Sequence, residues 1–163
     1  MRGSYDECEE YVANVAELME RHGIVLHKPA EGEDLELYED DAGALSFELV
    51  GALPDGSQPS RATVEVREEL RPVGGGRYQT SRYEYELIDG ARDYRRAFHL
   101  HDPEWFEREF LVVVHEHCER PPGQPDCKHY VGTPIKDSYA GVATLMDAWS
   151  AAPADCAALT CLD

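Results

Sequence analysis

Three strand-like runs between positions 61 and 100 restrict the fold of this chain more than any other feature. Apolar and polar residues alternate in RATVEVREEL and in RYQTSRYEYELI, as they do in strands that bury one face. The turn sequence VGGG at 73–76 separates these two runs, and Asp89-Gly90, a strong hairpin signal, precedes a third run, ARDYRRAFHL. The sequence therefore predicts three consecutive antiparallel strands.

Helical patterns are found near both ends of the chain. Residues 5–22 and 137–149 place apolar side chains on one side at helical spacing, and Asp137 suits the N-cap of the second helix. Consecutive hairpin strands between two helices predict an α+β fold, in which both helices pack on an antiparallel β-sheet meander. We expect a single domain over residues 1–150, followed by a short Ala-rich tail at 151–163.

Further elements are predicted from local composition. The acidic stretch 30–42 favours a short edge strand or a solvated loop, ALSFELVG at 44–51 favours a strand, and PDGSQPS at 54–60 favours a turn or mobile loop. An Asp-Pro pair at the start of 102–107 suits the beginning of a helix, and EFLVVVHEH at 109–117 is the most apolar strand in the chain. These strands extend the antiparallel meander.

The net charge of -18 is large for 163 residues and unevenly spread. Residues 1–60 contribute -12, residues 61–96 contribute +1 and residues 97–163 contribute -7. This charge disfavours an RNA partner, because phosphate binding depends on cationic side chains. An acidic surface has three ordinary explanations: solubility, life at high salt, or a cationic protein partner for the acidic face.

The sequence also bears on where the protein is found. No apolar run approaches the ~18–20 residues that a transmembrane helix needs. The start, MRGSYDECEEYV, lacks the apolar segment of a signal peptide. Five cysteines, an odd number, fit reduced thiols better than a disulfide framework. We therefore expect a cytoplasmic protein with no membrane partner.

The stretch VVVHEHCERPPGQPDCKHYVG at 112–132 holds three of the seven histidines and two of the five cysteines. Residues two apart on a strand share a face, so His115 and His117 project together. Cys127 and His129 would converge with them if CKHY continues the sheet. Imidazole and thiolate are ligands that zinc prefers, so these four residues form a candidate zinc site, although their spacing matches no standard zinc finger.

The same histidines support a metal-free alternative. His115 and His117 could act as acid and base, because imidazole titrates near neutral pH. Arg95 and Arg96 could then hold a phosphate beside them. Such a set of groups is what general acid–base cleavage of RNA requires, and it makes a nuclease-like protein the enzymatic hypothesis.

A third interpretation assigns no chemistry to this stretch. Strand-end histidines are often ordinary half-buried residues, and Cys118 with Cys127 could be small apolar fillers, or a disulfide in an exported protein. His99 and His101 also share a strand face. If their strand neighbours 109–117, four histidines would face one cleft.

Residues 77–132 resemble the TumE-type toxin family of bacterial toxin–antitoxin systems. In that family a strand of this kind precedes an arginine-bearing return strand, a histidine-containing linker and an H-x-H strand end. The matching pieces here are Arg82 to Ile88, Tyr94 to Phe98, His99 with His101, and His115 with His117. The resemblance implies growth inhibition through RNA and a protein partner. The chain departs from the family in its long acidic N-terminal third and in its Cys118–Cys127 loop.

Overall fold

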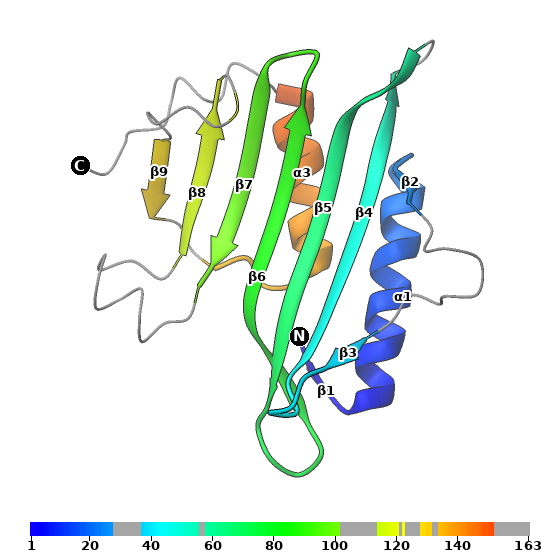
Figure 1. Cartoon of the computed structure of the whole chain (residues 1–163), viewed down its shortest axis with the longest axis vertical. Coiled ribbons are helices and arrows are strands. Elements are labelled where there is room, and N and C mark those ends of the chain that lie inside the picture. The colour runs from blue at the N-terminus through cyan, green and yellow to red at the C-terminus, as the bar shows by residue number, and fades with distance from the viewer. Residues whose placement is uncertain are drawn as a thin grey trace.

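One antiparallel sheet forms the body of the molecule (Figure 1). The computed structural model describes residues 1–27, 37–55, 58–101, 114–120, 122, 128–131 and 134–151. Nine strands in these residues form one sheet, and six of them follow one another in chain order as a meander. The six are β4 (Leu45–Asp55), β5 (Gln58–Pro72), β6 (Tyr78–Asp89), β7 (Tyr94–Leu100), β8 (Val114–Glu119) and β9 (Lys128–Val131). The others are β1 (Arg2–Gly3), which pairs with β6, and β2 (Val25–Leu26) and β3 (Tyr38–Glu39), which pair with β4.

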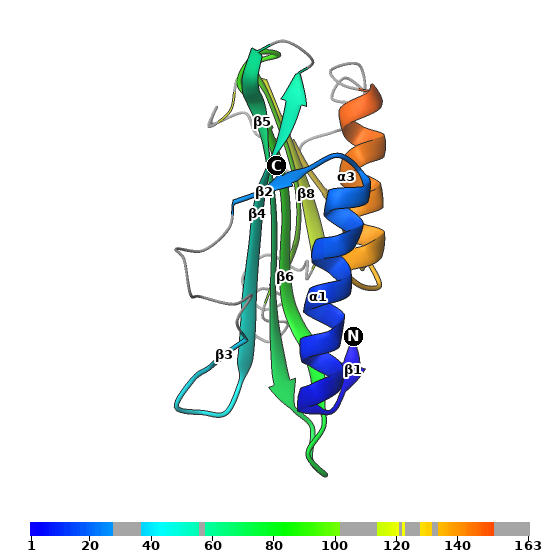
Figure 2. The same ribbon diagram turned by 90° about the vertical axis from the view of Figure 1, so that its right-hand side faces the viewer.

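Two helices, α1 (Tyr5–Arg21) and α3 (Ser138–Ala151), cover the same face of the sheet (Figure 2). A capping box starts α1, because Ser4 Oγ accepts from the Glu7 amide at 3.3 Å and Glu7 Oε2 accepts from the Ser4 amide at 2.7 Å. Asp137 caps α3 by accepting from the Ala140 amide at 3.0 Å. The α+β fold with an N-terminal and a C-terminal helix is therefore confirmed. Neither helix is both long and apolar enough to cross a bilayer.

The hydrophobic core lies between the two helices and the sheet face that they cover, which we call the inner face. Each fully buried aliphatic side chain there contributes about 1.5–3 kcal/mol through the hydrophobic effect. Its fully buried members include Val15 and Met19 of α1, Val64 and Val66 of β5, Leu87 of β6, and Val142 and Leu145 of α3. The alternation predicted for the strands thus places their apolar side chains toward the helices.

A buried carboxylate joins both helices to the inner face. Glu68 is 3% exposed, and its Oε1 accepts from the hydroxyls of Tyr11 at 2.8 Å, Tyr85 at 2.6 Å and, at closer range, Ser138. Its Oε2 accepts from the Thr80 hydroxyl at 2.9 Å. These donors belong to α1, β6 and α3, so one side chain holds three elements together.

The prediction of a loop at 54–60 was wrong for most of that segment. Strand β4 continues to Asp55 and β5 begins at Gln58, and these two residues are register partners. Pro54 has no N–H to give to the ladder, and the register shifts between Leu53 and Asp55, where that proline sits. A local irregularity therefore accommodates the proline without ending the strand.

Other predicted turns and segments have different outcomes. The glycines at 74–76 all have positive φ angles, as the predicted turn requires. The hairpin after Asp89 is also present, with Asp89 opposite Tyr94. The expected helix start at 102–107 lies outside the described residues, as do 109–113 of the expected strand, 152–163 of the expected tail and 30–36 of the acidic stretch.

Candidate metal centre on the outer face of the sheet

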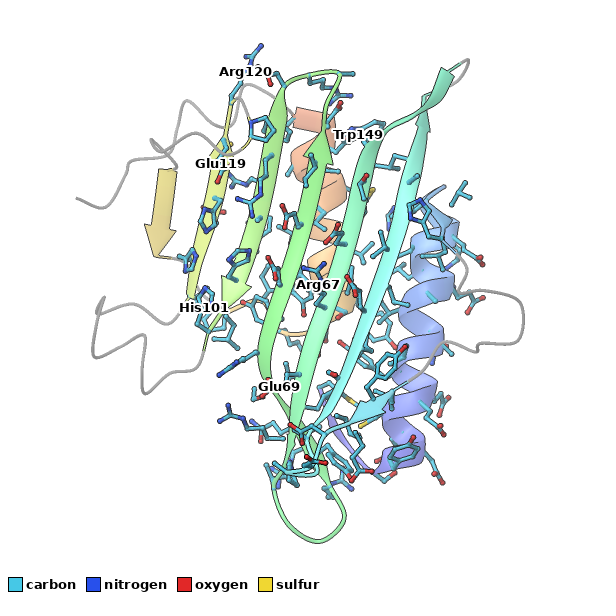
Figure 3. All side chains as sticks on the ribbon, viewed as in Figure 1. Arg67, Glu69, His101, Glu119, Arg120 and Trp149 are labelled. Carbon is cyan, nitrogen blue, oxygen red and sulfur yellow. The ribbon has the colours of Figure 1, made fainter. Side chains whose placement is uncertain are left out.

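The face of the sheet opposite α1 and α3, which we call the outer face, carries a row of charged and imidazole side chains. Directly opposed residues in an antiparallel ladder share a face. The registers place Arg67 opposite Glu84, Glu84 opposite His99, and His99 opposite His115. One polar row therefore crosses β5, β6, β7 and β8. Figure 3 shows this side of the sheet, with Arg67, His101 and Glu119 among its labelled side chains.

Four imidazoles gather at the β7–β8 end of this row. We call His99, His101, His115 and His117 the histidine cluster. Five of its ring pairs have centroids between 4.7 and 5.4 Å apart. The Nε2 atoms of His115 and His117 lie 2.8 Å apart. His99 is 8% exposed and His115 is 4% exposed, so much of the cluster is shielded from water.

Strand geometry explains how these rings meet. His99 follows Ala97 by two residues on β7, and His117 follows His115 by two residues on β8. Residues two apart on a strand share a face, so all four project to the outer face. Ala97 lies opposite His117 in the register and is fully buried. Its methyl group leaves space that the larger imidazoles occupy. The expectation that four histidines face one place therefore agrees with the geometry of the described residues.

Carboxylates contact the cluster from both sides. Glu84 Oε1 lies 3.2 Å from Nε2 of His99, and Glu119 Oε1 lies 3.4 Å from Nδ1 of His117. The contact with His99, together with electrostatic attraction to His99 and Arg67, holds the pKa of Glu84 down at about 2. Glu84 is therefore ionised at neutral pH.

Burial favours the neutral form of one imidazole in the cluster. It lowers the pKa of His101, and repulsion from His99 lowers that pKa further. A His101 ring with a lowered pKa is neutral at pH 7. The neutral imidazole is the form that binds metal ions, because a ring nitrogen keeps its lone pair.

Arginine side chains on the outer face are held by glutamates. Arg67 lies 2.7 Å from Glu48, 2.8 Å from Glu65 and 3.5 Å from Glu84. Three carboxylates around one guanidinium leave a net negative charge at this position. The row next to the histidine cluster therefore attracts cations more than it attracts anions.

Arg95 and Arg96, predicted to act together on a phosphate, lie on different faces. Arg95 lies on the outer face, where its Nη1 donates to Glu119 at 2.6 Å. Arg96 points to the inner face, pairs with Glu116 at 2.7 Å and lies over the Phe98 ring at 5.1 Å. Successive strand residues alternate between faces, so neighbours in the sequence cannot share one strand-face site. Of these two arginines, only Arg95 lies on the same face as the histidine cluster.

Three histidines lie close enough together that they could hold a metal ion. Ligand nitrogens of His99, His101 and His115 all lie within 4.8 Å of one another, and a second group is formed by Glu84, Glu86 and His99. Nitrogens that bind one zinc ion at about 2.0–2.1 Å lie roughly 3.4 Å apart. A contraction of the order of an ångström would close the site. The protein thus has a His/Glu cluster that could bind a metal ion.

The ligand set predicted from sequence overlaps with this cluster only in part. His115 and His117 belong to it. His129 is the register partner of His117 in the β8–β9 pair, and Cys127 lies outside the described residues. Cys118 is 3% exposed, packs in the core on the inner face, and is disulfide-bonded. Of the two alternatives raised for Cys118, the structure contains the disulfide.

A cavity of about 490 Å³ adjoins the histidine cluster on the outer face. His99 and His101 contribute to its wall, together with Arg67 and Arg82, and Tyr38 of β3 lines it as well. Glu84 is shared between the cavity and the second ligand group. The candidate metal centre therefore borders a space that a small molecule could enter.

Carboxylates of the site were not among the residues singled out from sequence. Glu84 and Glu86 alternate with tyrosine and leucine in a predicted strand, which puts them on the polar face. The hairpin after Asp89 sets the register that brings Glu84 opposite His99. Strand alternation combined with the hairpin register could therefore have predicted from sequence that Glu84 lies beside His99.

Comparison with known proteins adds no relative. A scan against protein-family models, a search of curated proteins and a search of solved structures each found no match. The resemblance of residues 77–132 to TumE-type toxins accordingly stays a prediction. Fold and site define an α+β protein with a His/Glu cluster on the outer face of its sheet.

Proposed function

We propose that the protein binds a divalent transition-metal ion, with zinc as the first expectation, through His99, His101 and His115. The convergence of three imidazole nitrogens within 4.8 Å carries this proposal. Imidazole is a favoured ligand of zinc, and three protein ligands are typical of zinc sites that keep a fourth position for another molecule. The ligands lie on two hydrogen-bonded strands and the residue after one of them, which limits how far they can move apart.

The charges around the cluster support a cation as its ligand. Glu84 contacts the metal-binding ring of His99, and Glu119 contacts His117 beside His115. Carboxylates in such positions orient imidazole rings and raise their affinity for metal. Arg67 and Arg95 are both engaged by carboxylates of the outer face. A phosphate group would have to compete with those carboxylates for each guanidinium.

Zinc titration of chelator-treated protein, followed by calorimetry and thermal melting, tests the proposal. We expect about one tight site per chain, because three ligands converge at one place. At a free zinc concentration of about 100 times the Kd, the folded state should gain about 2.7 kcal/mol. His99→Ala and His115→Ala should each weaken zinc binding by more than about 100-fold, since even residues that only support a ligand are worth 10–100-fold.

His27→Ala is the matched control, because His27 is an exposed histidine outside the cluster. It should leave zinc affinity unchanged. Equal zinc affinity in the wild type and in both cluster variants would refute the proposed site. Circular dichroism of each variant separates loss of a ligand from loss of the fold.

A second candidate function is metal-free cleavage of RNA, which the TumE-type resemblance implies. The observation that favours it is the 2.8 Å contact between the Nε2 atoms of His115 and His117, with Glu119 3.4 Å from the far nitrogen of His117. A carboxylate that orients an imidazole pair is a known arrangement for acid–base catalysis. Arg95 is the one predicted phosphate contact on that face.

Cleavage of a fluorescent RNA in the presence of a chelator tests this candidate. Activity that survives chelation and falls at least about 100-fold in His117→Ala is the expected result, because general acid–base groups contribute that much. Chelator-resistant RNA cleavage would favour the nuclease over the metal site. Absence of cleavage by the full chain, with and without metal, would exclude it for this substrate.

Cellular location and a cationic protein partner for the acidic face remain proposals as well. A cytoplasmic protein keeps its thiols reduced, whereas Cys118 is disulfide-bonded in this structure. Thiol titration of the unfolded, unreduced protein distinguishes the two situations. Five free thiols would support the cytoplasmic location, and no more than three would show that the disulfide forms. Charge reversal in 31–41 should weaken the binding of a cationic partner without affecting metal binding.

A further inference from the structure

The cavity and the metal centre share two of the three proposed ligands. His99 and His101 line the cavity of about 490 Å³ and also belong to the ligand group, whereas His115 belongs only to the ligand group. A metal ion held by these three rings therefore lies at the cavity wall. Nε2 of His99, in a ring that is 8% exposed, lies 3.2 Å from Glu84 Oε1, and this carboxylate can orient the ring toward a metal ion.

Three protein ligands leave a tetrahedral ion with one coordination position unfilled by protein. Structural zinc sites close that position with a fourth side chain, and catalytic or ligand-binding sites keep it for water or a substrate. His117, the remaining ring of the cluster, is engaged with His115 at 2.8 Å and lies 3.4 Å from Glu119. Those contacts compete with a role for His117 as the fourth ligand.

The walls of the cavity indicate what kind of molecule it takes. Its arginines, Arg67 and Arg82, each lie within 4 Å of a glutamate that also lines it, Glu48 for the first and Glu69 for the second. A molecule with several negative charges would meet these carboxylates. Tyr38, on β3, is 61% exposed and offers an aromatic surface at the end of the cavity away from the histidines.

We infer that the metal ion keeps an open coordination position toward this cavity, and that the cavity binds a small organic molecule. This molecule offers the metal one oxygen donor of the carboxylate or hydroxamate kind and extends an uncharged, aromatic-compatible body toward Tyr38. The inference rests on the proposed metal site. It makes the centre a ligand-binding site and not a closed structural one, and it excludes polyanions such as nucleic acid as occupants.

Distances across the sheet set the length of a suitable probe. Strand β3, which carries Tyr38, pairs with β4 on the side away from β5 and is therefore four strands from β7, so the two backbones lie roughly 19 Å apart at about 4.8 Å per strand. The side chains of Tyr38 and of the histidines cover part of that distance, so a ligand between them must span on the order of 10–14 Å. Biphenyl-4-hydroxamate has about that length, whereas acetohydroxamate carries the same metal-binding group without a body.

The experiment uses the full chain loaded with cobalt(II), whose visible spectrum reports coordination number. We expect acetohydroxamate to change the cobalt spectrum, and biphenyl-4-hydroxamate to bind more tightly. Tyr38→Ala should lower the affinity for biphenyl-4-hydroxamate by about five- to tenfold, as expected for one aromatic contact. It should leave the affinities for acetohydroxamate and for cobalt unchanged. Tyr5→Ala, which removes an exposed tyrosine on α1, is the control and should change neither probe.

The outcomes separate this inference from the proposal beneath it. Failure to bind cobalt at all would overturn the proposed metal function. Cobalt binding with a spectrum that neither hydroxamate alters would mean a closed site, and would overturn the inference alone. Equal effects of Tyr38→Ala on both probes would show that the ligand body does not occupy the cavity. Displacement of the hydroxamates by tripolyphosphate at equal concentration would contradict the exclusion of polyanions.

Discussion

Both faces of the sheet hold carboxylates that contact other polar side chains, and the groups that satisfy them differ. On the inner face, Glu68 accepts hydrogen bonds from four hydroxyls. On the outer face, Glu84 and Glu119 contact imidazole rings at 3.2 and 3.4 Å. A hydroxyl that donates to Glu68 joins secondary-structure elements, whereas an imidazole beside a carboxylate still has a second nitrogen to offer. The inner arrangement therefore serves stability, and the outer one can serve binding.

Charge follows the same division. The donors around Glu68 are neutral side chains from three elements, and the helices cover them. Around Glu84 the partners are Arg67 and His99, and part of this region borders a cavity. Substitutions on the inner face should therefore change the free energy of unfolding, while those on the outer face should mainly change ligand affinity. Predictions that compare the two faces test this difference.

The largest effect is expected for Glu68. Glu68→Ala would leave the hydroxyls of Tyr11, Tyr85 and Ser138 without their acceptor under the helices, and each unsatisfied buried group costs about 1–3 kcal/mol. We expect the free energy of unfolding to fall by about 3 kcal/mol or more. Urea denaturation followed by circular dichroism measures it.

Glu69→Ala is the matched control, because Glu69 is the next residue and projects to the outer face. Its side chain is 29% exposed and lies 3.1 Å from Arg71 and 3.7 Å from Arg82. Ion pairs of this kind contribute less than about 1 kcal/mol. Glu68→Gln keeps the volume and one acceptor oxygen, so it remains measurable if the alanine variant does not fold. Similar losses for Glu68→Gln and Glu69→Ala would contradict the comparison.

An alkaline limit to stability is the second prediction. Burial and the charge of Glu68 raise the pKa values of Tyr11 and Tyr85, and burial raises that of Tyr83. Tyrosine in the unfolded chain loses its proton near pH 10, while the folded protein retains it. The unfolded state then binds fewer protons, so stability is full below pH 10 and is lost as pH rises above it.

Each such tyrosine should lower the free energy of unfolding by up to about 1.4 kcal/mol per pH unit above pH 10. Urea denaturation between pH 8 and pH 11.5 measures the slope. Tyr11→Phe should reduce the slope by one tyrosine's share, whereas Tyr38→Phe, on the exposed edge strand, should leave it unchanged. A slope that does not respond to Tyr11→Phe would show that other groups limit alkaline stability.

Local patterns were sufficient to predict most of the fold. The alternation between 61 and 88 and the helical spacing at 5–22 each reflect one buried face, which neighbouring residues specify on their own. Most of the segment 54–60 was misassigned because its Pro and Gly are local turn signals. Pairing with β5 carries β4 past Pro54, and that pairing is not visible in local composition.

Prediction of the site was limited by register. Spacing of two residues placed His115 with His117, and His99 with His101, because alternation is a local property. Arg95 and Arg96 were grouped because they are adjacent in sequence, yet they project to opposite faces. Glu84 requires knowledge of which residue lies across the hairpin. Residues that belong to different strands are brought together by register, and a single residue of slip would exchange the two faces.

The smallest effect is expected for Glu84 in the metal-free protein. The pKa of Glu84 is about 2 in the folded state and near the ordinary 4.5 when the chain is unfolded. Its contribution to stability is therefore present above pH 4.5 and lost as pH falls through about 2. Because 35% of the side chain is exposed, solvent screening reduces this contribution to roughly 1 kcal/mol.

Glu84→Gln tests this value through its dependence on pH. The difference in free energy of unfolding between wild type and variant should be roughly 1 kcal/mol at pH 6 and should vanish toward pH 2, where Glu84 becomes protonated. Glu17→Gln, on the exposed side of α1, should give a smaller difference. A difference for Glu84→Gln that is the same at every pH would mean that the side chain acts through packing. In that case the outer face would resemble the inner one, with its carboxylate serving structure and not the orientation of His99.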